Sequence, residues 1–242
     1  MTQQSAYELF YWPGLPGRGE FVRLALEAAG APYVDHAQQP GGMAAMQALL
    51  EDPALPRPPF APPFLRDGRL LIGQTAAILL HLGQRHGLAP AEEEGRLWCH
   101  QIQLTIADLV AETHDTHHPV ASALYYEDQK PEAARRAKDF RDNRIPKFLG
   151  WFERILAANP AGPAHLVGHA RSYADLSLFQ TVEGLRYAFP RASTRALQQT
   201  PHVAALAASV AEWPRIAAYL ASPRRQPFSQ NGIFRHYPEL DG

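Results

Sequence analysis

The stretch PFLRDGRLLIGQTAAI, residues 63–78, contains the local signals that decide the fold of this chain. Two apolar runs, FL and LLI, flank Asp67-Gly68, a dipeptide that is typical of tight hairpin turns. Thr75 is a residue type favoured at helix N-caps, and an apolar stripe at helical spacing follows it over residues 75–85. The stretch therefore predicts an antiparallel hairpin that leads directly into a helix capped by Thr75.

The residues before the hairpin predict two strands and two helices. Tyr7 to Trp12 is aromatic and apolar, as in a short strand. Arg18 to Gly30 has apolar residues at helical spacing before a terminating glycine. A second short strand is predicted within residues 31–37, and a short helix from about Met43 to Leu50. This order favours a mixed sheet with helices on its faces.

Beyond residue 90 the sequence contains helical patterns and no convincing strand. Helices are predicted over residues 92–113, 131–158, 173–188 and 201–220. The tail, 222–242, contains proline, Asn-Gly and scattered aromatic residues, so we expect it to lie in extended form against the surface. We therefore expect an α/β domain over residues 1–86 and an all-helical domain with this extended tail over residues 91–242.

The composition excludes several classes of protein. The chain has 242 residues, 46% of them hydrophobic and 19% charged, which argues against intrinsic disorder. Its formal charge of −1 removes the general electrostatic reason to bind nucleic acid or anionic membranes. Cys99 is the single cysteine, which excludes an intrachain disulfide framework and suits a reducing compartment. Because the start is polar and no apolar run approaches the ~20 residues of a bilayer span, we expect a soluble cytoplasmic protein.

Three features of the N-terminal part are candidates for a binding site, and each also has an ordinary structural explanation. The free amides of the first helical turn at Thr75 can bind an anion, although caps are common in helices of any function. A cis bond before Pro63 would turn a strand edge toward an extended peptide, whereas a trans bond would make a plain linker. Tyr11 and Arg18 can face a ligand at that edge, or serve as a core aromatic residue and an ion pair.

Taken in this order and spacing, these features resemble the cytosolic glutathione transferases, which join a thioredoxin-like N-terminal domain to an all-α C-terminal domain. The resemblance covers nearly the whole chain. The stretch YELFYWPGLPGRGEFVR, residues 7–23, is similar to the opening strand and first helix of the tyrosine-type, sigma-like classes. Residues 63–78 are similar to the cis-proline segment and the Gln-Ser-x-Ala-Ile motif, with Thr75 in place of serine. Ser172 to Asp175 looks like the capping box of a later helix of the family.

The resemblance implies glutathione as co-substrate and assigns residues to its parts. The γ-glutamyl carboxylate would bind the amides and hydroxyl of Thr75 beside Gln74. The cysteinyl backbone would pair with the strand edge at Pro62 and Pro63. The chain would form a homodimer, in which the ammonium group of glutathione meets Asp108 of the partner subunit.

The resemblance further implies that Tyr11 activates the glutathione thiol. A free thiol has a pKa near ~8.5, so only about 3% is ionised at neutral pH. A hydrogen bond to a charged group contributes ~1.5–3 kcal/mol, enough to lower the thiol pKa by about 1 to 2. Tyr11 would act as a hydrogen-bond donor to the thiolate and not as a base, and Arg18 with the positive end of the first helix would add to the field.

Several positions depart from the family pattern. Pro62 has no N–H to donate to glutathione, Ala61 stands where the family usually has glutamine, and residues 38–50 lack the family's tryptophan and lysine. These departures favour an alternative, a binding or regulatory protein that keeps the fold without catalysis. Thiol–disulfide or peroxide chemistry is a third hypothesis, disfavoured because no cysteine stands at the active-site position.

The segment His114 to His118 is rich in groups that could bind a metal ion. Its spacing is not a recognised zinc motif, so we expect no metal site and assign the segment to the lining of the electrophile pocket. The predicted apolar pocket comprises Trp12, Leu15, His117, Tyr126 and Phe234. The sequence therefore predicts a tyrosine-type glutathione transferase that conjugates small apolar electrophiles, a detoxification reaction.

Overall fold

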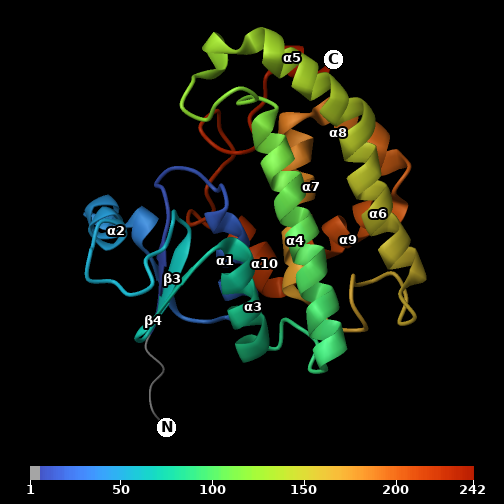
Figure 1. Cartoon of the computed structure of the whole chain (residues 1–242). Helices are drawn as coiled ribbons and strands as arrows, with labels where there is room; N and C mark the ends of the chain where they lie inside the picture. Colours follow the sequence, from blue (N-terminus) through green and yellow to red (C-terminus); the bar gives the residue numbers. More distant parts are fainter. Residues whose placement is uncertain (1–5) are drawn as a thin grey trace.

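The computed structural model of this protein describes residues 6–242 and combines a small sheet with a larger group of helices (Figure 1). The polar start, residues 1–5, on which the expectation of no signal peptide rests, lies outside the described residues. Within the described chain, no helix is both long and apolar enough to cross a bilayer. The architecture confirms the predicted fold class, an α/β N-terminal part followed by an all-helical C-terminal part.

Four strands form one mixed sheet in the order β2-β1-β3-β4. They are β1 (Tyr7–Phe10), β2 (Tyr33–Asp35), β3 (Phe64–Asp67) and β4 (Leu70–Gly73). β1 pairs in parallel with β2 and antiparallel with β3, and β3 pairs antiparallel with β4. The parallel pair needs a crossover connection, which the first helix supplies.

The hairpin turn lies at Gly68-Arg69, one residue later than the dipeptide that predicted it. Asp67 still pairs with Leu70 and therefore belongs to β3. The turn then requires a positive φ at Gly68, which is 58° and costs glycine little because it has no Cβ.

The register between β1 and β3 places the candidate site residues. Phe10 pairs with Phe64, and their rings stack with centroids 4.8 Å apart. Because the two strands are antiparallel, Tyr11 and Pro63 leave the sheet at the same end. The two phenylalanines and Met46 also form a small core of their own on one face of the sheet.

Helices cover both faces of the sheet (Figure 1). α1 (Gly19–Ala29) and α3 (Thr75–His86) lie on the face toward the helical part, and α2 (Gly42–Leu50) lies on the other, after a short 3₁₀ helix, η1 (His36–Gln38). α1 ends as predicted at Gly30, whose φ of 63° is the left-handed conformation typical of helix C-termini.

The C-terminal part consists of helices packed around α7, which is buried along almost its whole length and contacts both α4 and α9. The elements are α4 (Glu93–Asp115), η2 (Tyr126–Asp128), α5 (Lys130–Asp139), η3 (Phe140–Arg144), α6 (Ile145–Ala158), α7 (Tyr173–Ala188), α8 (Pro190–Gln198), α9 (Pro201–Ala211), α10 (Pro214–Leu220) and α11 (Pro238–Asp241). Figure 1 shows α4 crossing the molecule between the sheet and the outer helices α5 and α6.

Prolines explain most differences from the predicted helices. The long helix predicted over residues 131–158 contains a π-helical segment, η3, which ends two residues before Pro146, a residue without the N–H that a regular turn would use. The helix predicted over 201–220 is divided by Pro214 into α9 and α10. α8, which the sequence analysis missed, begins at Pro190, a residue favoured in the first turn of a helix.

The C-terminal tail is more deeply inserted than predicted. Phe234 and Ile233 are almost completely buried, and the Phe234 ring lies so close to Gly184 of α7 that this position has no room for a side chain. The tail therefore closes part of the helical core and is not merely extended across the surface.

A buried polar network joins the α/β part to the helical part. Arg23 of α1 is fully buried, and its Nε donates a 2.7 Å hydrogen bond to Asp35 Oδ2. Glu20 lies 3.3 Å from the same guanidinium group and accepts a 2.7 Å hydrogen bond from the Tyr219 hydroxyl of α10. Arg225 in the tail forms an ion pair with Glu20. Charged groups buried together in this way must be paired.

The capping box predicted at the start of α7 is present. Asp175 accepts hydrogen bonds from the Ser172 amide at 2.7 Å and from the Leu166 amide at 2.8 Å, and the Ser172 hydroxyl accepts from the Asp175 amide. We expect Ser172→Ala to lower the free energy of unfolding by about 1 kcal/mol because the amide loses its cap. Urea denaturation measures the difference, and an unchanged midpoint would contradict the capping role.

Candidate active site

The Pro62–Pro63 peptide bond is cis, as the family resemblance implied. Pro63 is buried and directly precedes β3, whereas Pro62 is half-buried. Neither residue has an N–H, so an extended peptide at this edge can donate to the Pro62 carbonyl but receives no hydrogen bond from its backbone nitrogen.

Thr75 is the first residue of α3 and not its N-cap, which corrects the prediction. Gln74 is the capping residue, with φ 67° and ψ 120°, and its side chain makes no capping hydrogen bond. Because Gln74 already takes the non-helical conformation at the junction with β4, the helix starts at Thr75. A positive φ in a residue with a side chain is uncommon and clusters at ligand-binding positions.

The side chain of Thr75 has an unsatisfied hydroxyl. Its Oγ1 is buried and has no hydrogen-bond partner in the described part of the chain. The first intrahelical bond of α3 runs from the Ile78 amide to the Gln74 carbonyl, so the amides of the first turn are also free. The start of α3 thus presents a hydroxyl and several N–H groups without partners, a combination suited to an anionic oxygen.

A small cavity of about 30 Å³ adjoins Thr75 where α1, α3 and α4 meet. Its lining residues are Arg18, Phe21, Thr75, Gln103, Ile106, Ala107 and Val110. The volume is that of about one water molecule. The arrangement brings together two of the predicted site residues, Arg18 and Thr75, and adds a polar residue from α4.

Gln103 is a site candidate that the sequence analysis missed. It is 2% exposed, and its side-chain oxygen has no partner among the described residues. The available signal was a polar residue on the apolar face of the predicted helix 92–113, since such residues are rarely buried without a partner.

Tyr11 follows β1 directly and is 5% exposed. Its hydroxyl accepts a 2.8 Å hydrogen bond from the Arg18 amide. The ring passes so close to Gly17 and Gly19 that a side chain at either position would collide with it. Tyr11 does not line the cavity beside Thr75, but Arg18 does, and the Arg18 amide is also the donor to the Tyr11 hydroxyl.

The environment keeps the Tyr11 hydroxyl protonated. Burial raises the pKa of Tyr11 above its usual value of 10, despite opposing effects from the Arg18 amide and the nearby guanidinium groups. The described residues provide an N–H to the phenol oxygen but no acceptor for its proton. The group is therefore able to donate a hydrogen bond and unsuited to act as a base at neutral pH.

Asp108 stands apart from this cluster, whereas Gln74 directly precedes Thr75. Asp108 is exposed on α4 and forms no ion pair within the described part of the chain. Gln74 is also exposed. The single chain thus brings Tyr11, Arg18 and Thr75 into one region and leaves Asp108 facing solvent.

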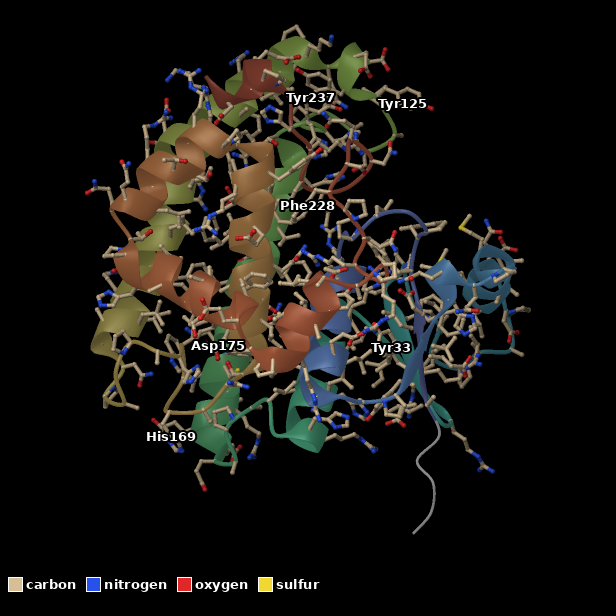
Figure 2. All side chains as sticks on the ribbon, turned by 180° about the vertical axis from the view of Figure 1, so that it is seen from behind. Tyr33, Tyr125, His169, Asp175, Phe228 and Tyr237 are labelled. Carbon is tan, nitrogen blue, oxygen red and sulfur yellow. The ribbon has the colours of Figure 1, made fainter. Side chains whose placement is uncertain are left out.

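None of the residues predicted to form the apolar pocket lines the cavity beside Thr75. Trp12 is 39% exposed, whereas Tyr126 and Phe234 are each 2% exposed. The Tyr126 hydroxyl donates a 2.9 Å hydrogen bond to Glu239, and its ring stacks on Tyr237 in the tail. Figure 2 shows Tyr237 and Phe228 along this inserted tail, whose depth the sequence analysis did not predict. Tyr126 and Phe234 are therefore packing residues in this structure.

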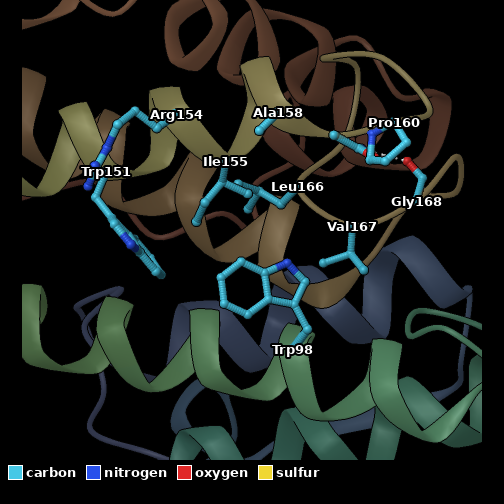
Figure 3. A pocket seen from close by; sticks show the side chains of 10 residues that line it. Trp98, Trp151, Arg154, Ile155, Ala158, Pro160, Leu166, Val167 and Gly168 are labelled. Atoms are coloured by element: carbon cyan, nitrogen blue, oxygen red, sulfur yellow. Dashed lines mark hydrogen bonds between the residues drawn. The ribbon is translucent and has the colours of Figure 1, made fainter.

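A larger cavity, of about 430 Å³, lies between α4 and α6 (Figure 3). Trp98, Trp151, Ile155 and Leu166 line it, and none of the predicted site residues does. Cys99, which directly follows Trp98 in α4, is fully buried, and burial raises the pKa of its thiol to about 11. The larger of the two cavities is therefore not the one lined by the predicted site residues. Cys99 is not a nucleophile at neutral pH, because its thiol stays protonated.

Comparisons with known proteins find similarity to glutathione S-transferases. Residues 114–223 match the family described as "Glutathione S-transferase, C-terminal domain". "Glutathione S-transferase P" of Bos taurus is 27% identical over 232 residues, which are 93% of this chain and 98% of that relative. "Glutathione S-transferase P 1" of Xenopus laevis is 26% identical over 220 residues, 90% of this chain and 93% of that relative.

Solved structures show the same fold. The Pi-class glutathione S-transferase of Onchocerca volvulus aligns with a TM-score of 0.69 at 20% identity, covering 89% of this chain and 92% of its own. The structure titled NaGST-2 aligns with a TM-score of 0.70 at 20% identity, covering 93% of this chain and 98% of its own. A mixed four-stranded sheet joined to a helical part is thus shared over nearly the whole length.

Proposed function

We propose that this chain, which has the fold of the cytosolic glutathione transferases and the C-terminal domain of that family, is a glutathione transferase. It joins the thiolate of glutathione to small apolar electrophiles. The observation that carries the proposal is the unsatisfied hydroxyl of Thr75 at the start of α3. This hydroxyl lies at the end of the sheet where the cis bond Pro62–Pro63 precedes β3.

The start of α3 suits the γ-glutamyl carboxylate of glutathione. Thr75 Oγ1 and the free amides of the first turn are donors, and the positive end of the helix favours an anion. Gln74 is exposed beside them and is assigned to the same carboxylate. The cysteinyl N–H of an extended tripeptide would then donate to the carbonyl of Pro62, next to Pro63.

In this proposal the protein is of the tyrosine-type, sigma-like class, and Tyr11 is the catalytic donor. Its hydroxyl, protonated and without an acceptor, stabilises the thiolate by one hydrogen bond. The Arg18 amide orients the phenol oxygen, and the Arg18 side chain adds positive charge near the sulfur. Holding both reactants together supplies the remaining rate enhancement.

The proposal includes a homodimer in the cytoplasm. Asp108 is exposed and unpaired in the described chain, which leaves it available to the ammonium group of glutathione bound in the partner subunit. Sedimentation equilibrium tests the dimer. The single buried cysteine, Cys99, suits a reducing compartment and supports the location.

We expect Thr75→Val to raise the KM for glutathione about 10-fold or more and to leave kcat within about 2-fold, because a hydrogen bond to the carboxylate is lost equally from the ground and transition states. Thr75→Ser, which keeps the hydroxyl, is the matched control and retains a KM near that of the wild type. Steady-state kinetics with varied glutathione measure both. Equal KM values for the wild type and both variants would contradict the placement of the glutathione carboxylate at the start of α3.

A second function, glutathione binding without catalysis, is favoured by one observation. Pro62 has no N–H, so one hydrogen bond to the cysteinyl backbone that an ordinary residue would provide is missing. Retention on immobilised glutathione with no conjugation of any electrophile would support this alternative. Turnover of a hydroperoxide without conjugation would instead indicate peroxide chemistry.

A further inference from the structure

Three histidine rings gather at the end of α4, outside the proposed glutathione site. His114 lies in the last turn of the helix, and the amides of His117 and His118 both donate to the His114 carbonyl at 3.2 Å. The chain therefore continues helically for one more turn, which places positions i, i+3 and i+4 on one face. The ring centroids lie 4.8 to 5.0 Å apart, and one nitrogen of each ring lies within 4.8 Å of the others.

Backbone carbonyls fix the orientation of two of these rings. His117 Nε2 lies 2.8 Å from the Ile233 carbonyl in the tail, and His118 Nδ1 lies 2.9 Å from the Leu124 carbonyl. A carbonyl oxygen only accepts hydrogen bonds, so Nε2 of His117 carries the proton and its Nδ1 has a free lone pair. Nδ1 of His118 also lies 3.3 Å from Nε2 of the Gln129 side chain, a second contact that orients this ring. A ring N–H held by a carbonyl is the outer-shell arrangement that orients histidines bound to metals.

His117 provides a second and independent observation. The residue is 1% exposed, and its Nδ1 is buried without a hydrogen-bond partner in the described part of the chain. A buried imidazole nitrogen with a free lone pair loses its hydration and gains nothing in return. A ligand that accepts this lone pair would satisfy it.

The charges around the cluster keep the imidazoles neutral. Burial, together with the neighbouring rings and the positive side chains of Arg18 and Arg235, lowers the pKa of His114 to about 4. Burial likewise lowers the pKa of His117 to about 3. Metal ions bind imidazole in its neutral form. The two arginines oppose a dication, and Asp115, 4.0 Å from His114 Nδ1, partly offsets them.

We propose that His114, His117 and His118 form a binding site for a divalent first-row transition metal ion such as Zn²⁺. Three imidazoles suit zinc, copper, nickel or cobalt and do not suit calcium or magnesium. At metal–nitrogen distances of ~2.0–2.1 Å a tetrahedral ion needs ligand nitrogens about 3.3 Å apart, so the rings must rotate toward one another.

The proposed site has a structural consequence. Three protein ligands leave a fourth tetrahedral position for water or for Asp115. His117 is hydrogen-bonded to Ile233, so the ion would be linked through this ring to the inserted tail. Metal binding should therefore stabilise the contact between the tail and the end of α4.

Isothermal titration of the full chain, purified without a histidine tag and freed of metal by a chelator, tests the site with Zn²⁺ as the probe. We expect one equivalent to bind, and we expect His114→Gln and His118→Gln each to weaken binding at least about 10-fold. His169→Gln is the matched control, because His169 is exposed in the connection between α6 and α7 (Figure 2) and leaves the affinity unchanged.

Two further measurements keep the test decisive. Circular dichroism of each variant shows whether lost binding reflects lost folding, and His114 and His118 are chosen because both are more exposed than His117. Co²⁺ at the same site should give the visible absorption of a tetrahedral nitrogen-ligated ion that Zn²⁺ abolishes. No binding to the wild type, or equal affinities in the wild type and the two folded variants, would overturn the proposal.

Discussion

Replacing Tyr11 with phenylalanine is expected to lower kcat/KM for conjugation of glutathione about 10- to 100-fold. The substitution removes one hydroxyl and keeps the ring that packs against Gly17 and Gly19. In the proposed mechanism that hydroxyl donates a hydrogen bond to the thiolate, and such bonds contribute ~1.5–3 kcal/mol. Without it, less of the bound thiol is ionised at neutral pH, so the nucleophile is scarcer.

The pH dependence of kcat/KM distinguishes a loss of thiol ionisation from a general disturbance of the active site. In the wild type, kcat/KM should rise with pH through the lowered pKa of the bound thiol and then level off. In Tyr11→Phe this rise should move up by about 1 to 2 pH units, so that the two enzymes converge at high pH. A rate loss that is equal at every pH would point to misplacement of the substrate and not to thiol ionisation.

Two controls complete the Tyr11 experiment. Tyr125→Phe removes an equivalent hydroxyl from a residue that is 77% exposed, and it should leave the rate unchanged. The dissociation constant for glutathione in Tyr11→Phe should stay near the wild-type value, because Thr75 and not Tyr11 binds the carboxylate in the proposal. Wild-type activity in Tyr11→Phe would leave the hydroxyl a structural partner of the Arg18 amide.

Local signals in the sequence were sufficient to predict the strands of the sheet and most of the helices. The hairpin and the helix end at Gly30 depend on backbone preferences of single residues, so the sequence predicts them well. The cis bond before Pro63 was implied only by the family resemblance, because backbone preference alone leaves most X-Pro bonds trans. The capping residue of α3 was assigned one residue too late, because nothing in the sequence indicates that Gln74 takes a positive φ. A threonine after a strand looks the same whether it caps the helix or begins it.

Features that depend on distant contacts were not predictable in the same way. Gln103 is a site candidate only because α1, α3 and α4 meet beside it. The histidine cluster was expected to hold no metal because its spacing matches no recognised motif. The carbonyl that orients His117 comes from Ile233, more than a hundred residues away, a contact that the local sequence does not reveal. Burial of Phe234 likewise requires the small residue Gly184 on α7. Such contacts follow from tertiary packing and not from periodicity.

Arg23→Met is expected to lower the free energy of unfolding by about 3–5 kcal/mol, the usual cost of leaving a buried charge without its partner. Arg23 is fully buried and donates to Asp35 at 2.7 Å and to the Pro16 carbonyl at 3.2 Å. Methionine fills much of the same volume, so the loss measures charge pairing more than packing. Asp35 would remain 7% exposed without its guanidinium partner, and Glu20 would keep only its contacts from the helical part.

Urea denaturation of Arg23→Met against Lys138→Ala makes this prediction specific. Lys138 pairs with Asp142 on the surface, with side-chain exposures of 71% and 45%, and loss of such a pair costs at most about 1 kcal/mol. Similar midpoints for the two variants would mean that water or a shifted side chain compensates the buried acids. The double variant Arg23→Met/Asp35→Leu should recover part of the lost stability, because both members of the pair are then apolar.

Arg23→Met should also disturb the position of Tyr11, the proposed catalytic residue, under conditions where the protein is still folded. Arg23 holds the Pro16 carbonyl in the loop between Tyr11 and Arg18, and its guanidinium lies 5.8 Å from the centre of the Tyr11 ring. Without this hydrogen bond the loop loses one of the contacts that position the Arg18 amide against the phenol oxygen. We therefore expect Arg23→Met to lower kcat at temperatures where circular dichroism still reports a folded protein, with little change in the KM for glutathione, which depends on α3. A parallel loss of both parameters would place the effect on the whole fold.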